Sequence, residues 1–153
     1  MSISLVLVPL AVALAVTVKT TVFEKMQQQY GTASKLEPMP TTFKDCNLLI
    51  KTLKEHGLSV SAVSQNQLSV KTGKYELHYN RTTQDEAFWV SVEGWNNADE
   101  LIEDINCLEK EYKLNVQSYT YDKLMSNISG AGMTVEEEVI LEDDSIMLTI
   151  TVD

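Results

Sequence analysis

The clearest periodic pattern lies in the last third of the chain, where apolar residues follow helical spacing. Tyr121, Leu124 and Ile128 recur at steps of three and four, which predicts one apolar face of a helix near 117–130. Gly132 follows, and glycine readily adopts the positive φ that ends a helix. The pattern therefore predicts a helix that packs through one face and ends at a glycine.

After this helix the period falls to two. Residues 133–141 and 146–152 alternate between apolar and polar side chains, which predicts two strands joined by the polar turn 142–145. Glu137 breaks the pattern, because it places a charge on the apolar face. We therefore expect this strand to be an edge strand or to carry a β-bulge, with Glu136 and Glu138 facing solvent.

Similar patterns occur earlier in the chain. Apolar residues at helical spacing predict helices near 42–56 and 98–113, and Thr42 with Asp45 resembles a capping box at the start of the first. Alternating segments predict four strands, at 58–62, 68–70, 75–79 and 87–94. The expected fold class is α+β, an antiparallel sheet with helices on one face.

A helix, a glycine and a hairpin occur twice in this order. The first copy covers residues 48–70 and contains Gly57, and the second covers residues 124–150 and contains Gly132. The recurrence favours a duplicated helix–hairpin unit. The alternative is chance, because glycine before a strand is a common boundary.

The N-terminal segment has a different composition. Residues 3–18 carry no charge and are rich in Ile, Leu and Val, which we interpret as a transmembrane helix of barely sufficient length. A cleaved signal peptide, which would export the domain, is one alternative, although no positive charge precedes the apolar run. A buried strand pair is another, because residues 12–18 also alternate.

These segments predict a domain layout with a membrane anchor at 1–19, a linker at 20–40 and an α+β domain at 41–153. Lys19 and Lys25 flank the apolar run on its C-terminal side only. The positive-inside tendency then places the folded domain on the cytoplasmic side of a single-pass protein.

Several of these segments also resemble a known family. QSYTYDKL, VEEE and DDSIMLTI, and more weakly FWVSVEGW and LLIKTLKEHGL, are similar to a small uncharacterised family of algal chloroplasts and cyanobacteria, the chloroplast reading frame thirty-five family. The resemblance covers about residues 41–152. No catalytic motif accompanies the family, so the resemblance implies a fold more than an activity.

Charge is unevenly distributed along the chain. The net charge is −10 in total, and the three segments 1–41, 42–83 and 84–153 contribute about +1, +3 and −14. A strongly acidic second half argues against binding nucleic acid through its phosphates. It favours an acidic surface for a protein partner with a basic surface. The exposed side of the helix near 98–113 carries the candidate partner surface, Glu100, Glu103 and Asp104.

The sequence contains little recognisable chemistry. His56 and His78 are the only histidines, at a helix end and on the outer face of a strand, and no Cys/His spacing typical of a zinc site occurs. We therefore expect no catalytic residue, metal site or cofactor. The acidic runs 136–138 and 142–144 favour a solvated hairpin over a hard-cation site. Cys46 and Cys107 lie among apolar neighbours, so we expect buried free thiols.

Four aromatic residues remain as candidates for a ligand groove: Trp89, Trp95, Tyr119 and Tyr121. Filling the core is the alternative role for them. The main functional hypothesis is a membrane-anchored, non-catalytic adaptor with an acidic surface. The alternative hypothesis is a ligand-binding or enzymatic domain that uses the aromatic groove. A pocket with converging polar groups would favour the second hypothesis, and a flat acidic face over a filled core would favour the first.

Overall fold

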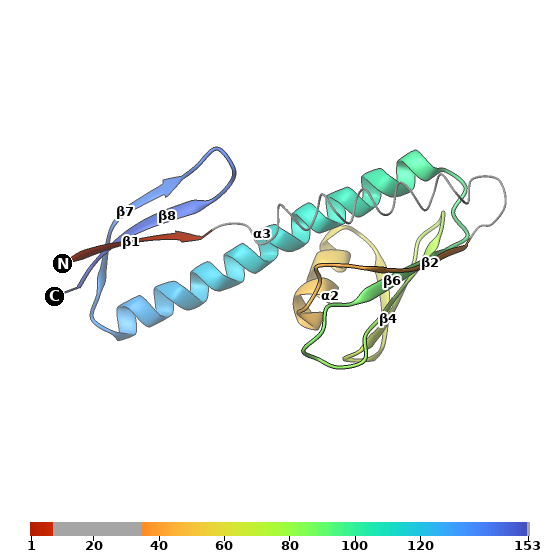
Figure 1. Ribbon diagram of the computed structural model, residues 1–153, viewed down its shortest axis with the longest axis horizontal. Coiled ribbons are helices and arrows are strands. Elements are labelled where there is room, and N and C mark those ends of the chain that lie inside the picture. Colours follow the sequence, from red (N-terminus) through yellow and green to blue (C-terminus); the bar gives the residue numbers. More distant parts are fainter. Residues whose placement is uncertain (8–34, 153) are drawn as a thin grey trace. The chain divides into compact units, whose positions relative to one another are not determined.

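The computed structural model describes residues 1–7 and 35–152. In this part the chain is α+β, with antiparallel sheets and two helices, which confirms the predicted class. The strands form two sheets, where the pattern predicts one. The residues also divide into two compact units (Figure 1). We call residues 35–112 the five-stranded unit, and residues 1–7 with 113–152 the three-stranded unit.

The five-stranded unit contains the four predicted strands, one further strand, a short helix and the first half of helix α3 (Ala98–Gly130). The strands are antiparallel in the order β2-β6-β5-β4-β3, so β6, β5 and β4 each pair with a neighbour on both sides. The other elements are β2 (Lys35–Pro40), α2 (Cys46–Glu55), β3 (Ser59–Ser64), β4 (Gln67–Lys71), β5 (Glu76–Asn80) and β6 (Trp89–Glu93).

One face of the five-stranded sheet is apolar and buried. Leu77 and Val92 are cross-strand partners on this face and are fully buried. Aromatic rings connect the sheet to the helices, since Phe43 contacts Tyr79 with ring centroids 5.9 Å apart and Tyr112 of α3 at 4.7 Å. These edge-to-face contacts are a favourable ring geometry. They join β5, the segment before α2 and the first half of α3 in one core.

Helix α2 begins later than predicted. Asp45, not Thr42, is its N-cap, and the Asp45 carboxylate accepts a hydrogen bond of 2.9 Å from the backbone N–H of Leu48. The residues just before the cap are held elsewhere, because the backbone N–H of Thr41 donates to the carbonyl oxygen of Phe88 at 3.0 Å. A pairing contact with the sheet therefore replaces the first turn that the capping pattern predicts.

The three-stranded unit has a smaller core. It contains β1 (Ser2–Leu7), β7 (Thr134–Ile140), β8 (Ile146–Thr151) and the second half of α3, with the strands antiparallel in the order β1-β8-β7. Its buried cluster consists of Ile128 from α3 and Leu148 and Ile150 from β8. Partly buried side chains surround this cluster: Tyr121, Leu124, Met125, Met133, Val135 and Ile146.

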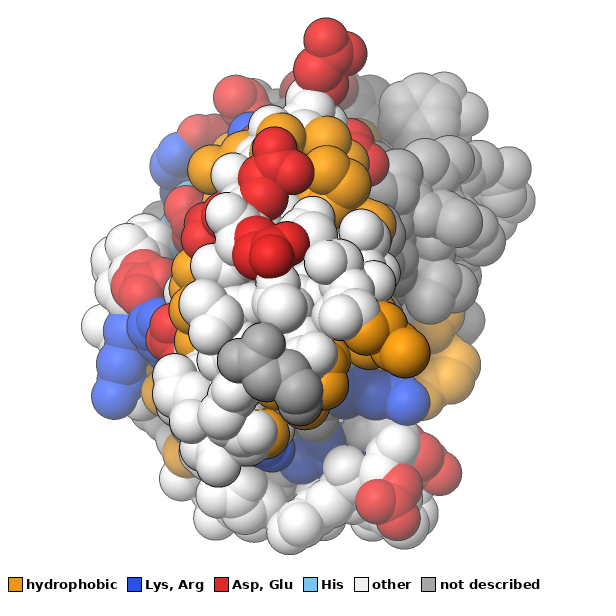
Figure 2. Space-filling view, turned by 90° about the vertical axis from the view of Figure 1, so that its left-hand side faces the viewer, with side chains coloured by type: hydrophobic (Ala, Val, Ile, Leu, Met, Phe, Trp, Pro, Cys, Tyr) orange, Lys and Arg blue, Asp and Glu red, His pale blue; other side chains and the backbone are white. Residues whose placement is uncertain are grey.

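Strand β7 confirms the interpretation of Glu137. It lies at an edge of its sheet, and its register with β8 shifts between Val135 and Glu137. Glu136 and Glu138 are exposed, as predicted. Ile140 is also 70% exposed. Acidic side chains therefore stand among hydrophobic ones on this side of the molecule (Figure 2).

Helix α3 is a single helix where the pattern predicts two. Residues 114–116, between the predicted helices, include neither glycine nor proline. The backbone hydrogen-bond ladder therefore continues through them, because these are the residues that most often break a helix. The resulting helix has 33 residues, which corresponds to a length of about 50 Å.

The N-terminal segment departs from its prediction where the structure describes it. Residues 2–7 form β1, which pairs with β8, so they are a strand and not the beginning of a helix. Of the helices in the described residues, none combines the length and the apolar character that crossing a membrane requires. The rest of the predicted anchor lies outside the described residues.

Most of the predicted linker 20–40 lies outside the described residues as well. Its last six residues are not a linker, because they form the edge strand β2. Pro38 and Pro40 lie in this strand. Their position fits the physical rule that proline, which lacks an N–H donor, is confined to sheet edges.

Candidate functional site

The open face of the five-stranded sheet carries rows of mainly polar side chains. The register of β4, β5 and β6 places residues directly opposite each other across three strands, so each row has one residue from each strand. Side chains opposite each other in a sheet are close enough to interact. The three rows are Gln67–Asn80–Trp89, Ser69–His78–Ser91 and Lys71–Glu76–Glu93.

A concave surface of about 400 Å³ lies over these rows. Its volume falls in the range of known ligand sites, but its lining is more polar than theirs. The polar residues that line it come from these three strands: Gln67, Ser69, Glu76, His78, Asn80, Ser91 and Glu93. The surface therefore suits a ligand recognised through hydrogen bonds and charge.

His78 is the centre of this surface. Its Nδ1 lies 3.5 Å from the Ser69 hydroxyl, and its Nε2 lies 3.5 Å from Glu76 Oε2 and 3.9 Å from Glu93 Oε2. The other Glu76 oxygen pairs with Lys71 Nζ at 3.2 Å. The three clustered side chains are partly exposed, at 31% for His78, 38% for Glu76 and 41% for Glu93. Both carboxylates and the imidazole can therefore reach a ligand from solvent.

The order Ser69–His78–Glu76 follows the arrangement of a nucleophile, a base and an acid. A hydrolytic site of this kind also needs N–H donors directed at the developing oxyanion. Strands β4, β5 and β6 lie inside the sheet and pair on both sides, so their backbone N–H groups are used in the ladders. The backbone N–H groups of these three strands are therefore not available for that role.

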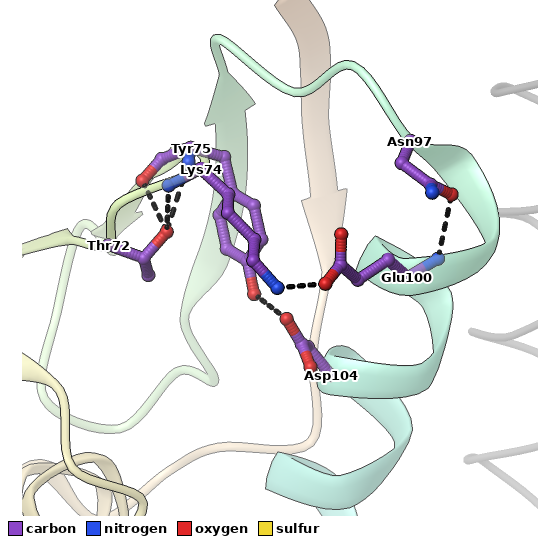
Figure 3. A network of polar contacts seen from close by, with 6 residues as sticks. All are labelled: Thr72, Lys74, Tyr75, Asn97, Glu100 and Asp104. Atoms are coloured by element: carbon purple, nitrogen blue, oxygen red, sulfur yellow. Dashed lines mark hydrogen bonds and ion pairs between the residues drawn. The ribbon is translucent and has the colours of Figure 1, made fainter.

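The predicted acidic partner surface is largely occupied by contacts within the protein. The Tyr75 hydroxyl donates to Asp104 at 2.5 Å, and the Lys74 ammonium pairs with the Glu100 carboxylate (Figure 3). Burial and the contact with Asp104 raise the pKa of Tyr75. Glu103 is exposed. Two of the three candidate residues therefore connect α3 to the segment between β4 and β5.

The four candidate aromatic residues are not brought together within either unit. Trp89 is 48% exposed on the open face of the five-stranded sheet, whereas Trp95 is buried. Tyr119 and Tyr121 belong to the three-stranded unit. The Tyr121 hydroxyl donates to Glu138 at 2.8 Å, and this bond is the main cause of the raised pKa of Tyr121. None of the four lines the concave surface described above.

The two cysteines differ in their surroundings. Cys46 is buried as predicted, and burial raises the pKa of its thiol. Cys107 is exposed, contrary to prediction. It lies in the same helix turn as the buried Leu108, and apolar neighbours in sequence do not determine which side of a helix a residue occupies.

Sequence reasoning placed His78 on the outer face of a strand but missed the cluster around it. The available signal was the alternation of Glu76 and His78, which puts both side chains on one face. The sequence does not place Glu93 in this cluster, because the sequence of neither strand shows that β5 pairs with β6. The serines at 59, 61, 64 and 69 were likewise predicted to face outward; the first three are exposed and Ser69 is partly buried.

In comparisons with protein-family models, curated proteins and solved structures, nothing matches this chain. The resemblance to the chloroplast reading frame family stays a prediction that rests on the short segments quoted above.

Proposed function

We propose that this protein is a non-catalytic binding module that holds a small cationic ligand on the open face of its five-stranded sheet. The observation that carries the proposal is the concave surface, where polar side chains from three adjacent strands converge. Convergent polar groups in a concave surface favour a ligand-binding domain over an adaptor.

The charge of the lining supports a cation. Glu76 and Glu93 both line the concave surface, and the lining includes no lysine or arginine among the described residues. Lys71 contacts Glu76 from the side and is 73% exposed. The two carboxylates give the lining itself a negative charge, and negative charge in a concave surface attracts cations.

A protein partner that docks on the acidic helix is less well supported. Glu100 and Asp104 already have partners within the chain. Of the predicted membrane attachment through residues 3–18, the part at 8–18 lies outside the described residues. It stays a prediction from the sequence, as does the cytoplasmic location.

The test is a titration of the full, tag-free chain, labelled with ¹⁵N, with small amines, guanidines and neutral sugars. Cationic fragments are expected to shift the amide signals of residues 67–69, 76–80 and 91–93, and neutral sugars are not. Glu93→Gln should weaken these shifts, and the matched control Glu55→Gln, on the surface of α2, should not. Absence of shifts on this face with every cation, organic or inorganic, would contradict the proposal. Shifts confined to the acidic side of α3 would support the docking hypothesis instead.

A further inference from the structure

We propose that Glu76, His78 and Glu93 form a binding site for a divalent transition-metal ion such as Zn²⁺. This inference rests on the proposed function, because it names the class of cation that one part of the open face selects. One ligand atom from each of the three side chains lies within 4.8 Å of the other two. The spacing of Cys and His along the chain predicts no such site, since these ligands come from two strands.

The positions of the donor atoms fit a metal ion with a small adjustment. Metal bonds to imidazole nitrogen and carboxylate oxygen are about 2.0–2.2 Å long, so two donors at a tetrahedral angle lie about 3.4 Å apart. His78 Nε2 lies 3.5 Å from a Glu76 oxygen and 3.9 Å from a Glu93 oxygen. The two carboxylate oxygens lie within 4.8 Å of each other, so side-chain movements of up to about an ångström would bring all three donors to bonding distance.

The backbone holds the three ligands in place. Glu76 and His78 alternate on β5, and Glu93 is the direct cross-strand partner of Glu76 on β6. Both strands are paired on each side within the sheet. Ligands on such strands need less ordering when a metal binds than ligands on a loop. This part of the site is preformed by the sheet.

A contact behind the imidazole sets its orientation. The Ser69 hydroxyl lies 3.5 Å from His78 Nδ1, which leaves Nε2 facing the two carboxylates. Metal-binding histidines usually have their second ring nitrogen held in this way by a neighbouring group. In the neutral imidazole with its proton on Nδ1, the Nε2 lone pair would face two negative charges. A bound metal ion removes this repulsion.

The two carboxylates themselves point to a cation. Like charges placed directly opposite each other in a sheet are destabilising, and Glu76 and Glu93 are such a pair. Lys71 offsets part of the charge of Glu76.

The donor set favours a transition metal over calcium or magnesium. Calcium and magnesium prefer oxygen ligands only, whereas imidazole suits zinc, copper, nickel and iron. Three protein ligands leave at least one coordination position for water or for a further ligand. The side chains are 31–41% exposed, so this position is open to solvent.

The experiment is a calorimetric titration of the full, tag-free chain with Zn²⁺, repeated with Co²⁺ to record the visible absorption of the bound ion. One ion per chain is expected. His78→Gln and Glu93→Gln should each weaken binding more than about tenfold, and Ser69→Ala about tenfold, in line with the effect of removing a supporting group. Lys71→Gln should strengthen binding, because it removes a nearby positive charge.

His56→Gln is the matched control, because His56 also contacts a carboxylate, that of Glu111 at 3.2 Å. Among the described residues, no second carboxylate lies with this pair at the spacing of a metal site. It should leave Zn²⁺ binding unchanged. Circular dichroism should show that each variant is folded. The inference is overturned if no ion binds, if His78→Gln binds Zn²⁺ as tightly as the parent, or if His56→Gln abolishes binding. If organic cations still shift the sheet face while Zn²⁺ does not bind, this inference fails and the proposed function stands. If neither binds, both fail.

Discussion

The five-stranded unit and the three-stranded unit contain the same local motif, a helix, a glycine and a hairpin, but the hairpin is extended by different strands in each. Helices α2 and α3 are each followed by a glycine in the left-handed region, Gly57 with φ 81° and Gly132 with φ 71°. In both, the next backbone N–H reaches back over the glycine to close a Schellman motif. These bonds run from Leu58 N to Leu53 O at 3.0 Å and from Met133 N to Ile128 O at 3.1 Å.

Beyond the hairpin the two units differ. In the five-stranded unit, the strands that extend the hairpin β3–β4 include β5, the next strand in the chain, and a deep aromatic core forms beneath them. In the three-stranded unit, the hairpin β7–β8 is extended by β1 from the other end of the chain, over a buried cluster of Ile128, Leu148 and Ile150. The same local pattern therefore supports two cores of very different size.

The largest expected effect comes from truncating the small core. Leu148 is fully buried in the three-stranded unit, and Leu148→Ala should lower the free energy of unfolding by about 2–5 kcal/mol. Because so few side chains are buried there, we expect this unit to open while the other stays folded. Hydrogen exchange should show lost protection in β7 and β8 but retained protection in β4, β5 and β6.

Leu77→Ala is the matched control for this variant, since Leu77 is equally buried in the five-stranded unit. Both tryptophans, Trp89 and Trp95, belong to that unit, so their fluorescence reports its unfolding. Leu77→Ala should shift the fluorescence transition and Leu148→Ala should not. Equal shifts in the two variants would show that the units unfold together.

Replacing the glycine that ends the helix should cost about the same stability in both units. At Gly57 and Gly132 an added Cβ would meet no atom within 4 Å, so the cost of a substitution arises from the positive φ. Gly57→Ala and Gly132→Ala should each cost about 1–2 kcal/mol. Urea unfolding of each variant measures this cost. A cost in one unit several times that in the other would show that the two motifs are not equivalent.

Alkaline pH should lower the stability of the five-stranded unit more than that of the three-stranded unit. Burial raises the pKa of Tyr79 and Tyr75 above the ordinary value of 10.0. A group whose pKa is higher in the folded state stabilises the protein below its unfolded pKa, and this contribution is lost as pH rises toward the folded pKa. Stability measured by tryptophan fluorescence should therefore be constant from pH 8 to 9.5 and fall above pH 10. Tyr79→Phe should make that fall smaller, and an unchanged slope would contradict this assignment.

The smallest effect on stability is expected at the acidic edge of the three-stranded unit. Glu136 and Glu137 are exposed on the edge strand β7, and replacing both with threonine should change the free energy of unfolding by less than about 0.5 kcal/mol. Charges on an edge strand discourage pairing between molecules. Light scattering should therefore show more self-association of the double variant than of a Glu142→Thr control. Equal scattering would show that these charges do not protect the edge.

Individual elements show how far the sequence could be interpreted. The alternation of residues 133–141 predicted an edge or bulged strand from Glu137 alone, and both features occur. The start of α2 was misplaced, because Thr41 is held by a backbone bond to Phe88, which is distant in sequence. Residues 2–7 alternate only weakly and are uniformly apolar or small, so they fit a strand as well as a helix until β8 is beside them.

The candidate site also combines features that the sequence determines with features that only the tertiary structure decides. The sequence by itself determined that Glu76 and His78 share the outer face of a strand, that the glycines end the helices and that charge concentrates in the second half. Only the tertiary structure decided that Glu93 lies opposite Glu76, that Asp104 bonds to Tyr75 and that the hairpins belong to separate sheets. The physical reason is that a repeat along the chain specifies the face on which a side chain lies. Which strand lies beside it depends on packing between segments far apart in sequence.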